Sequence, residues 1–203
     1  MKLPCLLQFR ILKVAIKSLF GKPFTTKFPA VSYEPIPQFR GRPRFNKEKC
    51  IGCGACAEVC PSKCIDVTDN TTSTPPVRKL AQHLDACIWC GQCERYCTTR
   101  EGIKQSTEYD CAEFTPGSFD DSVEKELLLC ENCGAVIAPV DQLVWLVKKL
   151  GPLAFANPTL MLVSHSQLAV VDKGVQIQTP TPIRNQRVMI QCPKCLRKTA
   201  LVV

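Results

Sequence analysis

Eight of the fifteen cysteines in this 203-residue chain fall into two runs with the same spacing. The runs are Cys50-x2-Cys53-x2-Cys56-x3-Cys60-Pro61 and Cys87-x2-Cys90-x2-Cys93-x3-Cys97. Thiolates at this spacing bind the irons of [4Fe–4S] clusters, and the last cysteine of each run ligates the other cluster of the pair. We therefore predict two clusters, one ligated by Cys50, Cys53, Cys56 and Cys97 and the other by Cys87, Cys90, Cys93 and Cys60.

A disulfide framework is the alternative explanation for so many cysteines. Disulfides do not require two copies of one spacing, however, and we recognise no secretory signal that would direct the chain to an oxidising compartment. A cluster with four thiolate ligands has no open coordination site for a substrate. The pattern therefore favours electron transfer, and we expect no catalytic residues.

Four further cysteines form two pairs, Cys130-x2-Cys133 and Cys192-x2-Cys195. Such pairs, with Gly or Pro inside or just after them, close tetrahedral four-thiolate sites that hold zinc, or a single iron as in rubredoxin. We predict a structural metal site here, and four thiols without a metal are the alternative. The remaining cysteines are expected to be reduced, packed thiols: Cys5, Cys64 and Cys111.

The cysteine runs must be positioned by short elements, and residues 44–110 contain two copies of one such unit. Each copy is predicted to have a strand, the cysteine loop, a short helix after the fourth cysteine and a returning strand. The expected strands are 44–48, 64–68, 79–84 and 103–108. Gly54 and Gly91 allow the backbone to approach a cluster. Apolar loop residues, Ile51 and Ile88 among them, are expected to keep water from the sulfurs.

Between the tail cysteine pairs, Pro139 to Leu150 is predicted to be a helix that ends at Gly151, because its apolar residues share one face. Residues 160–163 and 168–171 are predicted to be strands of a hairpin. A metal would therefore fasten the two ends of a small C-terminal domain.

The positive charge of the chain is concentrated at its start. Residues 1–49 have a net charge of +9, and the other 154 residues sum to −1. Residues 3–20 predict an amphipathic helix with Arg10, Lys13 and Lys17 in one stripe. Three central cations argue against a transmembrane helix, and the interrupted apolar region without a small-residue cleavage site argues against a signal peptide.

We expect this helix to lie on a membrane surface or a membrane subunit, and packing on the protein's own core is the alternative. The prolines between residues 23 and 43 predict an extended segment after it. The fold class is thus α+β: a basic docking arm (1–43), a bacterial-type 2[4Fe–4S] ferredoxin core (44–115) and a four-cysteine, rubredoxin- or zinc-ribbon-like domain (116–203).

This order of parts, with Gln38-Phe39-Arg40-Gly41-Arg42 before the cysteine runs, resembles the two-cluster subunit of formate hydrogenlyase-type, membrane-bound (group 4) [NiFe] hydrogenases. That subunit is similar in turn to chain I of respiratory complex I. The complex I resemblance covers about residues 1–115. The hydrogenase resemblance also includes the Ala-Pro-Val helix start after Cys133 and the terminal Cys-Pro-Lys-Cys-Leu-Arg-Lys run.

The resemblance implies a peripheral electron relay on the cytoplasmic side of the cell membrane. Its expected partners are the small and large [NiFe] hydrogenase subunits, membrane-arm subunits and an electron-donor module. A complex I-type quinone oxidoreductase relay and a free ferredoxin are the rival interpretations. A metal-stapled nucleic-acid-binding protein is disfavoured, because such a protein has no need of redox clusters.

Overall fold

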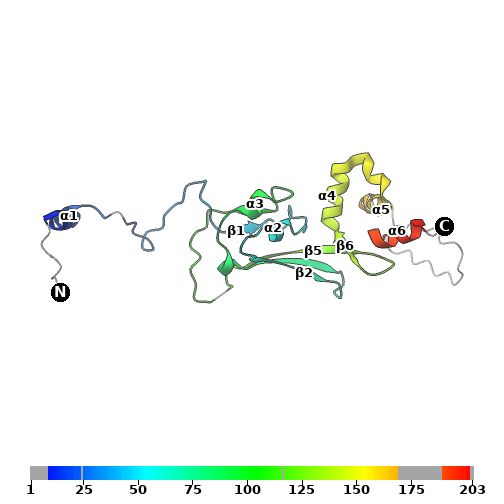
Figure 1. Ribbon diagram of the computed structural model, residues 1–203, viewed down its shortest axis with the longest axis horizontal. Coiled ribbons are helices and arrows are strands. Elements are labelled where there is room, and N and C mark those ends of the chain that lie inside the picture. The colour runs from blue at the N-terminus through cyan, green and yellow to red at the C-terminus, as the bar shows by residue number, and fades with distance from the viewer. Residues whose placement is uncertain (1–8, 24, 116, 169–188, 202–203) are drawn as a thin grey trace, which may run out of the picture. The chain divides into compact units, whose positions relative to one another are not determined.

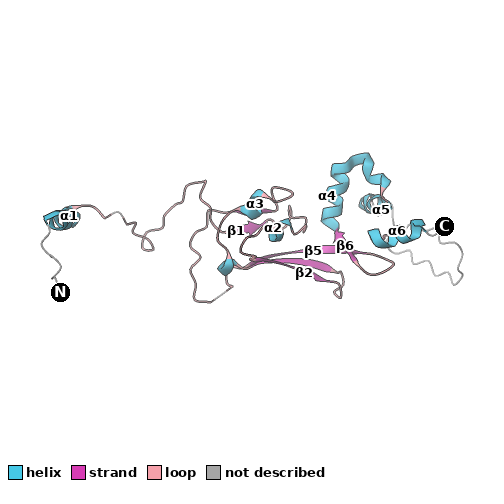
Figure 2. Ribbon diagram, viewed as in Figure 1, coloured by secondary structure: helices cyan, strands magenta, loops and turns pink. Residues whose placement is uncertain are grey.

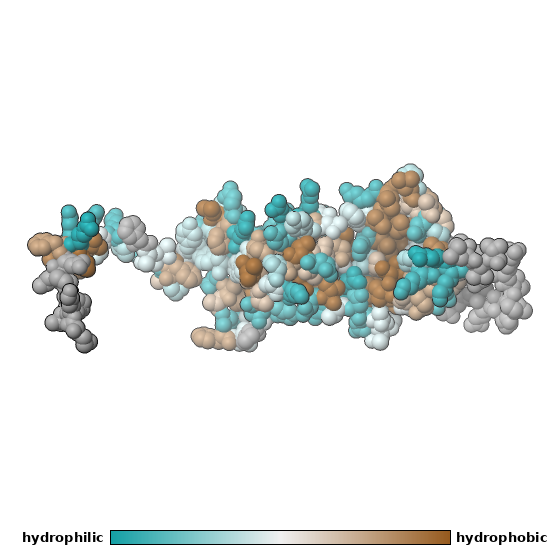
Figure 3. All heavy atoms as spheres, viewed as in Figure 1, coloured by the Kyte–Doolittle hydropathy of each residue, from teal (hydrophilic) through white to brown (hydrophobic). Residues whose placement is uncertain are grey.

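The computed structural model describes residues 9–23, 25–115, 117–168 and 189–201. The chain divides into two compact units, Met1–Pro37 and Gln38–Val203. The first contains the helix α1 (Phe9–Phe20), which buries none of its residues. Polar and apolar residues occupy separate sides of α1 (Figure 3). This confirms the predicted helix over residues 9–20, whereas 3–8 lie outside the described residues.

Regular structure is absent from the described residues between α1 and Pro43, as the prolines predicted. Among all the helices of the described residues, none is both long and apolar enough to span a membrane.

The second unit combines short strands and helices (Figures 1 and 2). Its strands are β1 (Pro43–Phe45), β2 (Ile65–Asn70), β3 (Val77–Gln82), β4 (Ile103–Gln105), β5 (Asp121–Leu129) and β6 (Val136–Pro139). Its helices are α2 (Ala55–Glu58), α3 (Gln92–Arg95), α4 (Val140–Leu150), α5 (Pro158–Gln167) and α6 (Pro193–Leu201), with 3-10 turns η1 (Leu84–Ala86) and η2 (Gly151–Ala156).

Strand pairing interleaves the two cysteine runs. β1, before the first run, pairs antiparallel with β4, after the second. β2, after the first run, pairs antiparallel with β3, before the second. The start of the first run therefore lies beside the end of the second, and the end of the first lies beside the start of the second. This arrangement gives a physical reason for the last cysteine of one run to lie near the first three of the other.

The two cysteine loops have the same backbone conformation. Left-handed φ angles recur 37 residues apart, at Gly52 and Trp89 (68° and 57°) and at Gly54 and Gly91 (77° and 76°). The pair Gly54 and Gly91 immediately precedes α2 and α3. The repeat seen in the cysteine spacing is therefore also a repeat of backbone geometry.

The short helices differ from the prediction. α2 and α3 contain the third cysteines, Cys56 and Cys93, and end before the fourth cysteines, whereas we expected them to follow. The left-handed glycine turns the chain directly into the helix after the second cysteine. The fourth cysteine then falls in the loop that leaves the helix.

β5 was not predicted, and it continues the sheet beyond residue 115. The sheet order is β2-β3-β5-β6, with Leu80 of β3 opposite Val123 of β5. Both residues belong to an apolar core with Phe45, Ile65 and Ile103, against which the cluster cysteines pack. The sequence Ser-Val-Glu-Lys-Glu-Leu alternates only weakly in hydropathy, which is why the strand escaped notice.

β5 and β6 cover the first cysteine loop and leave the second open. A Cβ on Gly52 would lie 3.1 Å from the Lys125 side chain and 3.2 Å from Pro139, so a side chain there would be tightly crowded. The equivalent position of the second loop carries Trp89, and the neighbouring Ile88 is 62% exposed. The expectation that Ile88 shields the sulfurs of a cluster stays a prediction.

The Gln38–Arg42 motif anchors the chain where it enters the second unit. Gly41 N–H donates to Ser106 O at 2.9 Å, and a Cβ on Gly41 would lie 2.3 Å from Glu108 O. The buried Arg42 guanidinium donates to Phe119 O and stacks 5.3 Å from the Phe119 ring. The motif thus stabilises the contact between this segment and residues 106–119.

In the C-terminal part, α4 confirms the predicted helix, and Gly151 ends it with φ 56°. The predicted strand at 160–163 is wrong, because these residues lie in α5. Asn157 caps α5 by accepting the N–H groups of Thr159 and Leu160, and Pro158 occupies the first turn. These start signals outweigh the apolar run. Leu168 ends α5, and the rest of the second predicted strand lies outside the described residues.

We expect Gly52→Ala to destabilise the protein more than Gly134→Ala. Both glycines have φ 68°, so both variants carry the same left-handed strain of about 1–2 kcal/mol. Only Gly52 has neighbours in the way, and that overpacking should add about 1–3 kcal/mol. Anaerobic thermal unfolding of the loaded protein measures the difference, and equal melting temperatures would contradict the covering of the first loop.

Candidate metal centres

The first predicted ligand set lies around one cavity. Cys50, Cys53, Cys56 and Cys97 line it, together with the backbone of Gly54 and Gly102. Cys97 comes from the second run and the other three cysteines come from the first. The fold therefore brings these four cysteines to one cavity, although Cys50 and Cys97 lie 47 positions apart in the sequence.

These thiols need a positive partner to ionise together. Burial, followed by the negative charges of Cys50, Cys53 and Cys93, raises the pKa of Cys56 to about 12. Burial is also the main reason that the pKa of Cys50 is raised. Iron ions that accept the thiolates would remove this penalty. The residues present therefore fit a cluster.

The four cysteines of the second ligand set interact electrostatically, and none of them is fully buried. The pKa of Cys93 is raised to about 11 by burial and by the charges of Cys87, Cys90 and Cys60. Cys87 lines a surface cavity of about 290 Å³ and Cys90 a second one of about 380 Å³. Both cysteines are only partly buried.

Hydroxyl groups beside the fourth cysteines escaped the sequence analysis. Ser62 Oγ lies 3.5 Å from Cys60 Sγ, and Thr99 Oγ1 lies 3.5 Å from Cys97 Sγ, two residues after the cysteine in both runs. Burial alone would raise the pKa of Cys60 and Cys97. These hydroxyls, together with backbone N–H groups, lower it instead. The sequence does contain a signal for them, because a hydroxyl residue stands two positions after the fourth cysteine in both runs.

Of the three cysteines predicted to be packed thiols, Cys64 is buried and Cys111 is half-buried, whereas Cys5 lies outside the described residues. Cys64 Sγ is 3.4 Å from Cys60 Sγ, and Cys64 N–H also faces that sulfur at 3.4 Å. Burial and the contact with Cys60 raise the pKa of Cys64 to about 12, so it is a neutral thiol.

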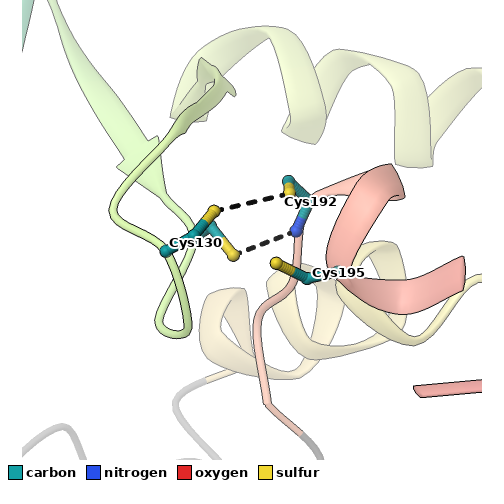
Figure 4. Close-up of side chains that lie close together, drawn as sticks. Cys130, Cys192 and Cys195 are labelled. Carbon is teal, nitrogen blue, oxygen red and sulfur yellow. Dashed lines mark hydrogen bonds between the residues drawn. The ribbon is translucent and has the colours of Figure 1, made fainter. Parts of the chain in front are cut away.

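The tail cysteines form the four-cysteine group that the sequence predicted. The sulfurs of Cys130, Cys133, Cys192 and Cys195 all lie within 4.8 Å of one another. Cys130 precedes the turn between β5 and β6, and Cys192 immediately precedes α6, which carries Cys195. Figure 4 shows the side chains of Cys130, Cys192 and Cys195 converging from these elements.

Backbone N–H groups are aimed at the tail sulfurs. Cys192 N–H donates to Cys130 Sγ at 3.3 Å, and with the N–H groups of Cys133 and Asn132 it lowers the pKa of Cys130 to about 6. Contact with Cys133, followed by burial, raises the pKa of Cys195 to about 12. The group thus contains both a stabilised thiolate and a thiol that a metal would have to deprotonate.

The geometry suits a tetrahedral metal site. Four thiolates about 2.3 Å from a zinc ion place neighbouring sulfurs about 3.8 Å apart. The sulfurs of Cys133 and Cys192 are 3.7 Å apart. A bound Zn²⁺ or single iron would neutralise these thiolates and join β5–β6 to α6.

Comparison with known proteins agrees with this arrangement. Residues 43–66, which include the first cysteine run, match the 4Fe-4S binding domain family. NADH-quinone oxidoreductase subunit I 2 of Geobacter metallireducens is 31% identical over 114 residues, covering 53% of this chain and 86% of that protein. NAD(P)H-quinone oxidoreductase subunit I of Gloeobacter violaceus is 30% identical over 133 residues, which are 63% of each protein.

A solved structure is also similar, a chain of the membrane-bound sulfane sulfur reductase, an archaeal respiratory membrane complex. The identity is 29% and the TM-score is 0.37, over 54% of this chain and 56% of that one.

The fold and the cysteine sets define an iron–sulfur protein of the [4Fe–4S] class. More specifically, the chain belongs to the family of subunit I of the NADH-quinone oxidoreductases. It is an iron–sulfur electron-transfer subunit related to chain I of complex I. The match to the Geobacter relative covers 53% of this chain.

We expect the tail site to hold one metal ion that stabilises the C-terminal part of the second unit. Cys195→Ser should lower the tail metal content and the melting temperature, while the acid-labile sulfide of the clusters stays unchanged. Elemental analysis together with sulfide determination measures both quantities. Cys111→Ser is the control, since Cys111 lies outside the four-cysteine group. A protein that keeps its tail metal and stability in Cys195→Ser would contradict the assignment.

Proposed function

We propose that this chain relays electrons through two [4Fe–4S] clusters to the small subunit of a membrane-bound [NiFe] hydrogenase. Cys50, Cys53, Cys56 and Cys97 ligate one cluster. Cys87, Cys90, Cys93 and Cys60 ligate the other. The observation that carries the relay is the convergence of Cys97 with three cysteines of the first run around one cavity. The chain supplies ligands and insulation, and its partners supply the catalytic site.

The tail supports the choice of a hydrogenase. A four-cysteine group follows the cluster domain, as in the hydrogenase subunits that the sequence resembles. The match to the Geobacter relative covers 86% of that protein but only 53% of this chain, so this chain has additional length outside the match. We assign the tail site zinc or a single iron in a structural role.

A complex I-type quinone oxidoreductase is the second candidate. It is favoured by the family to which the chain belongs, because both curated relatives described above are quinone oxidoreductase subunits. The two candidates share the relay and differ in the next electron carrier.

The relay is tested first in the isolated full chain, loaded under strictly anaerobic conditions. We expect about eight cluster irons and as many sulfides per chain, and reduced-state EPR of two magnetically interacting [4Fe–4S]⁺ centres. Fewer than about six cluster irons would refute the relay.

The partner is tested in the complex purified from its native source. Under H2, we expect the EPR signals of both clusters to appear, and the complex should contain nickel. Reduction by a quinol or a nicotinamide but not by H2, in a complex without nickel, would refute the hydrogenase assignment and support the quinone oxidoreductase.

The arm provides the attachment to the complex. In α1 the apolar residues are exposed, including Phe9 at 90% and Leu19 at 80%, although burying them would be favourable. Cations on the same helix suit an anionic lipid surface. The chain is thus a peripheral subunit on the cytoplasmic side of the membrane, where membrane-arm subunits and an electron-donor module flank it.

Deleting residues 1–20 is expected to release the subunit from membranes or from its complex without loss of cluster iron. Ile16→Asp should weaken the association, because it places a charge on the apolar side of α1. Ser18→Asp, which adds the same charge elsewhere on the helix, is the control. Membrane flotation measures the association. Unchanged association of the deletion variant would count against the role of the arm.

A further inference from the structure

Two cations lie side by side on the core face of the sheet, next to the first cysteine loop. Arg78 of β3 is directly opposite Lys125 of β5. Side chains alternate between the faces of a strand, so these two share a face with Leu80 and Val123 of the core. Their side chains are only 18% and 12% exposed.

Both cations contact the loop itself. The Arg78 guanidinium points at Gly52 O, 3.4 Å away. The Lys125 ammonium donates to Lys47 O at 2.8 Å, just before the first cysteine. The stem of Lys125 packs over Gly52, where a Cβ would lie 3.1 Å from it. The loop is therefore held by two positive groups from the sheet.

Placing the two cations Arg78 and Lys125 opposite each other on the core face is unfavourable unless negative charge lies nearby. Like charges opposite each other in a sheet repel, and buried cations lose hydration. Each cation has one carboxylate partner, Asp69 for Arg78 and Asp141 for Lys125, both at 2.6 Å.

The second cysteine loop has a different electrostatic setting. Trp89 occupies the position equivalent to Gly52. The Arg40 guanidinium lies 3.4 Å from Cys90 O of this loop, and the exposed Arg95 lines the same surface cavity. Arg40 is exposed, so water and salt screen its charge. The two loops thus share a backbone but differ in the charge buried against them.

We propose that Arg78 and Lys125 tune the cluster ligated by Cys50, Cys53, Cys56 and Cys97, raising its reduction potential relative to the same loop without them. Reduction adds one electron and one negative charge to the cluster, and no bond forms or breaks. The electron comes from the upstream carrier of the complex, or from a dithionite-reduced mediator in a titration. Two fixed, poorly hydrated cations stabilise that added charge. The inference rests on the proposed two-cluster relay.

The test is an EPR-monitored redox titration of the loaded full chain. Lys125→Met removes the ammonium and keeps an unbranched stem over Gly52. We expect the midpoint potential of one cluster to fall and that of the other to stay at its wild-type value. Lys125→Arg, which keeps the charge, should retain the wild-type potential.

A matched control lies on the same sheet. Lys79 follows Arg78 in β3, is exposed, and faces away from the core. Lys79→Met makes the same change of charge there and should move neither potential. Asp141→Asn gives the opposite sign, because removing the exposed carboxylate leaves the Lys125 ammonium uncompensated. We expect it to raise the potential that Lys125→Met lowers.

The outcomes separate this proposal from the relay on which it rests. A wild-type chain without two clusters would refute the relay. A two-cluster chain in which Lys125→Met moves neither potential, or moves both equally, would overturn the tuning role. Equal shifts in Lys125→Met and Lys79→Met would overturn it as well. If Lys125→Met fails to load iron, the Asp141→Asn variant provides the test. A potential of the first cluster that is unchanged or lowered in Asp141→Asn overturns the proposal.

Discussion

The repulsion among buried thiolates is the constraint on which the rest of this structure depends. Cysteine sulfurs make up much of the small core, and burial alone would keep them protonated, as the raised pKa of Cys56 shows. The fold opposes this by directing hydrogen-bond donors at the sulfurs. Ser62 and Thr99 do so at the fourth cysteines, and backbone N–H groups do so at Cys130. Bound metal would complete the compensation.

Interleaved strands make the convergence possible. β1 with β4 and β2 with β3 join the start of one cysteine run to the end of the other, so that each loop faces a cysteine of its counterpart. β5 then breaks the symmetry of this duplicated core. It covers the first loop through Lys125 and leaves Ile88 of the second loop exposed. Ile88 of the second loop is 62% exposed, whereas Ile51 of the first is 8% exposed, so the second loop is the more open of the two.

The tail uses cysteines where apolar contacts are few. Its helices pack around a small cluster that includes Leu143, Leu160 and Val163, and Cys130, Cys192 and Cys195 form a separate one with Ile137. A tetrahedral metal would join Cys133 to Cys192, which are 59 residues apart in the sequence. One ion can thus close a long segment that a core of this size would hold only weakly.

Cysteine spacing by itself determined the [4Fe–4S] class and the four-cysteine tail and predicted the two ligand sets, because metal coordination imposes short, regular distances along the chain. Helix start and stop signals likewise predicted α1 and α4. The hairpin predicted after α4 was wrong, because that prediction rested on the apolar run. The helix start signal of Asn157 and Pro158 decides the structure there instead. β5 and the cations opposite each other on β3 and β5 were decided by tertiary structure alone. They depend on contacts such as Arg78 with Gly52, 26 residues apart, and Lys125 with Lys47, 78 residues apart, and no local pattern encodes such pairs.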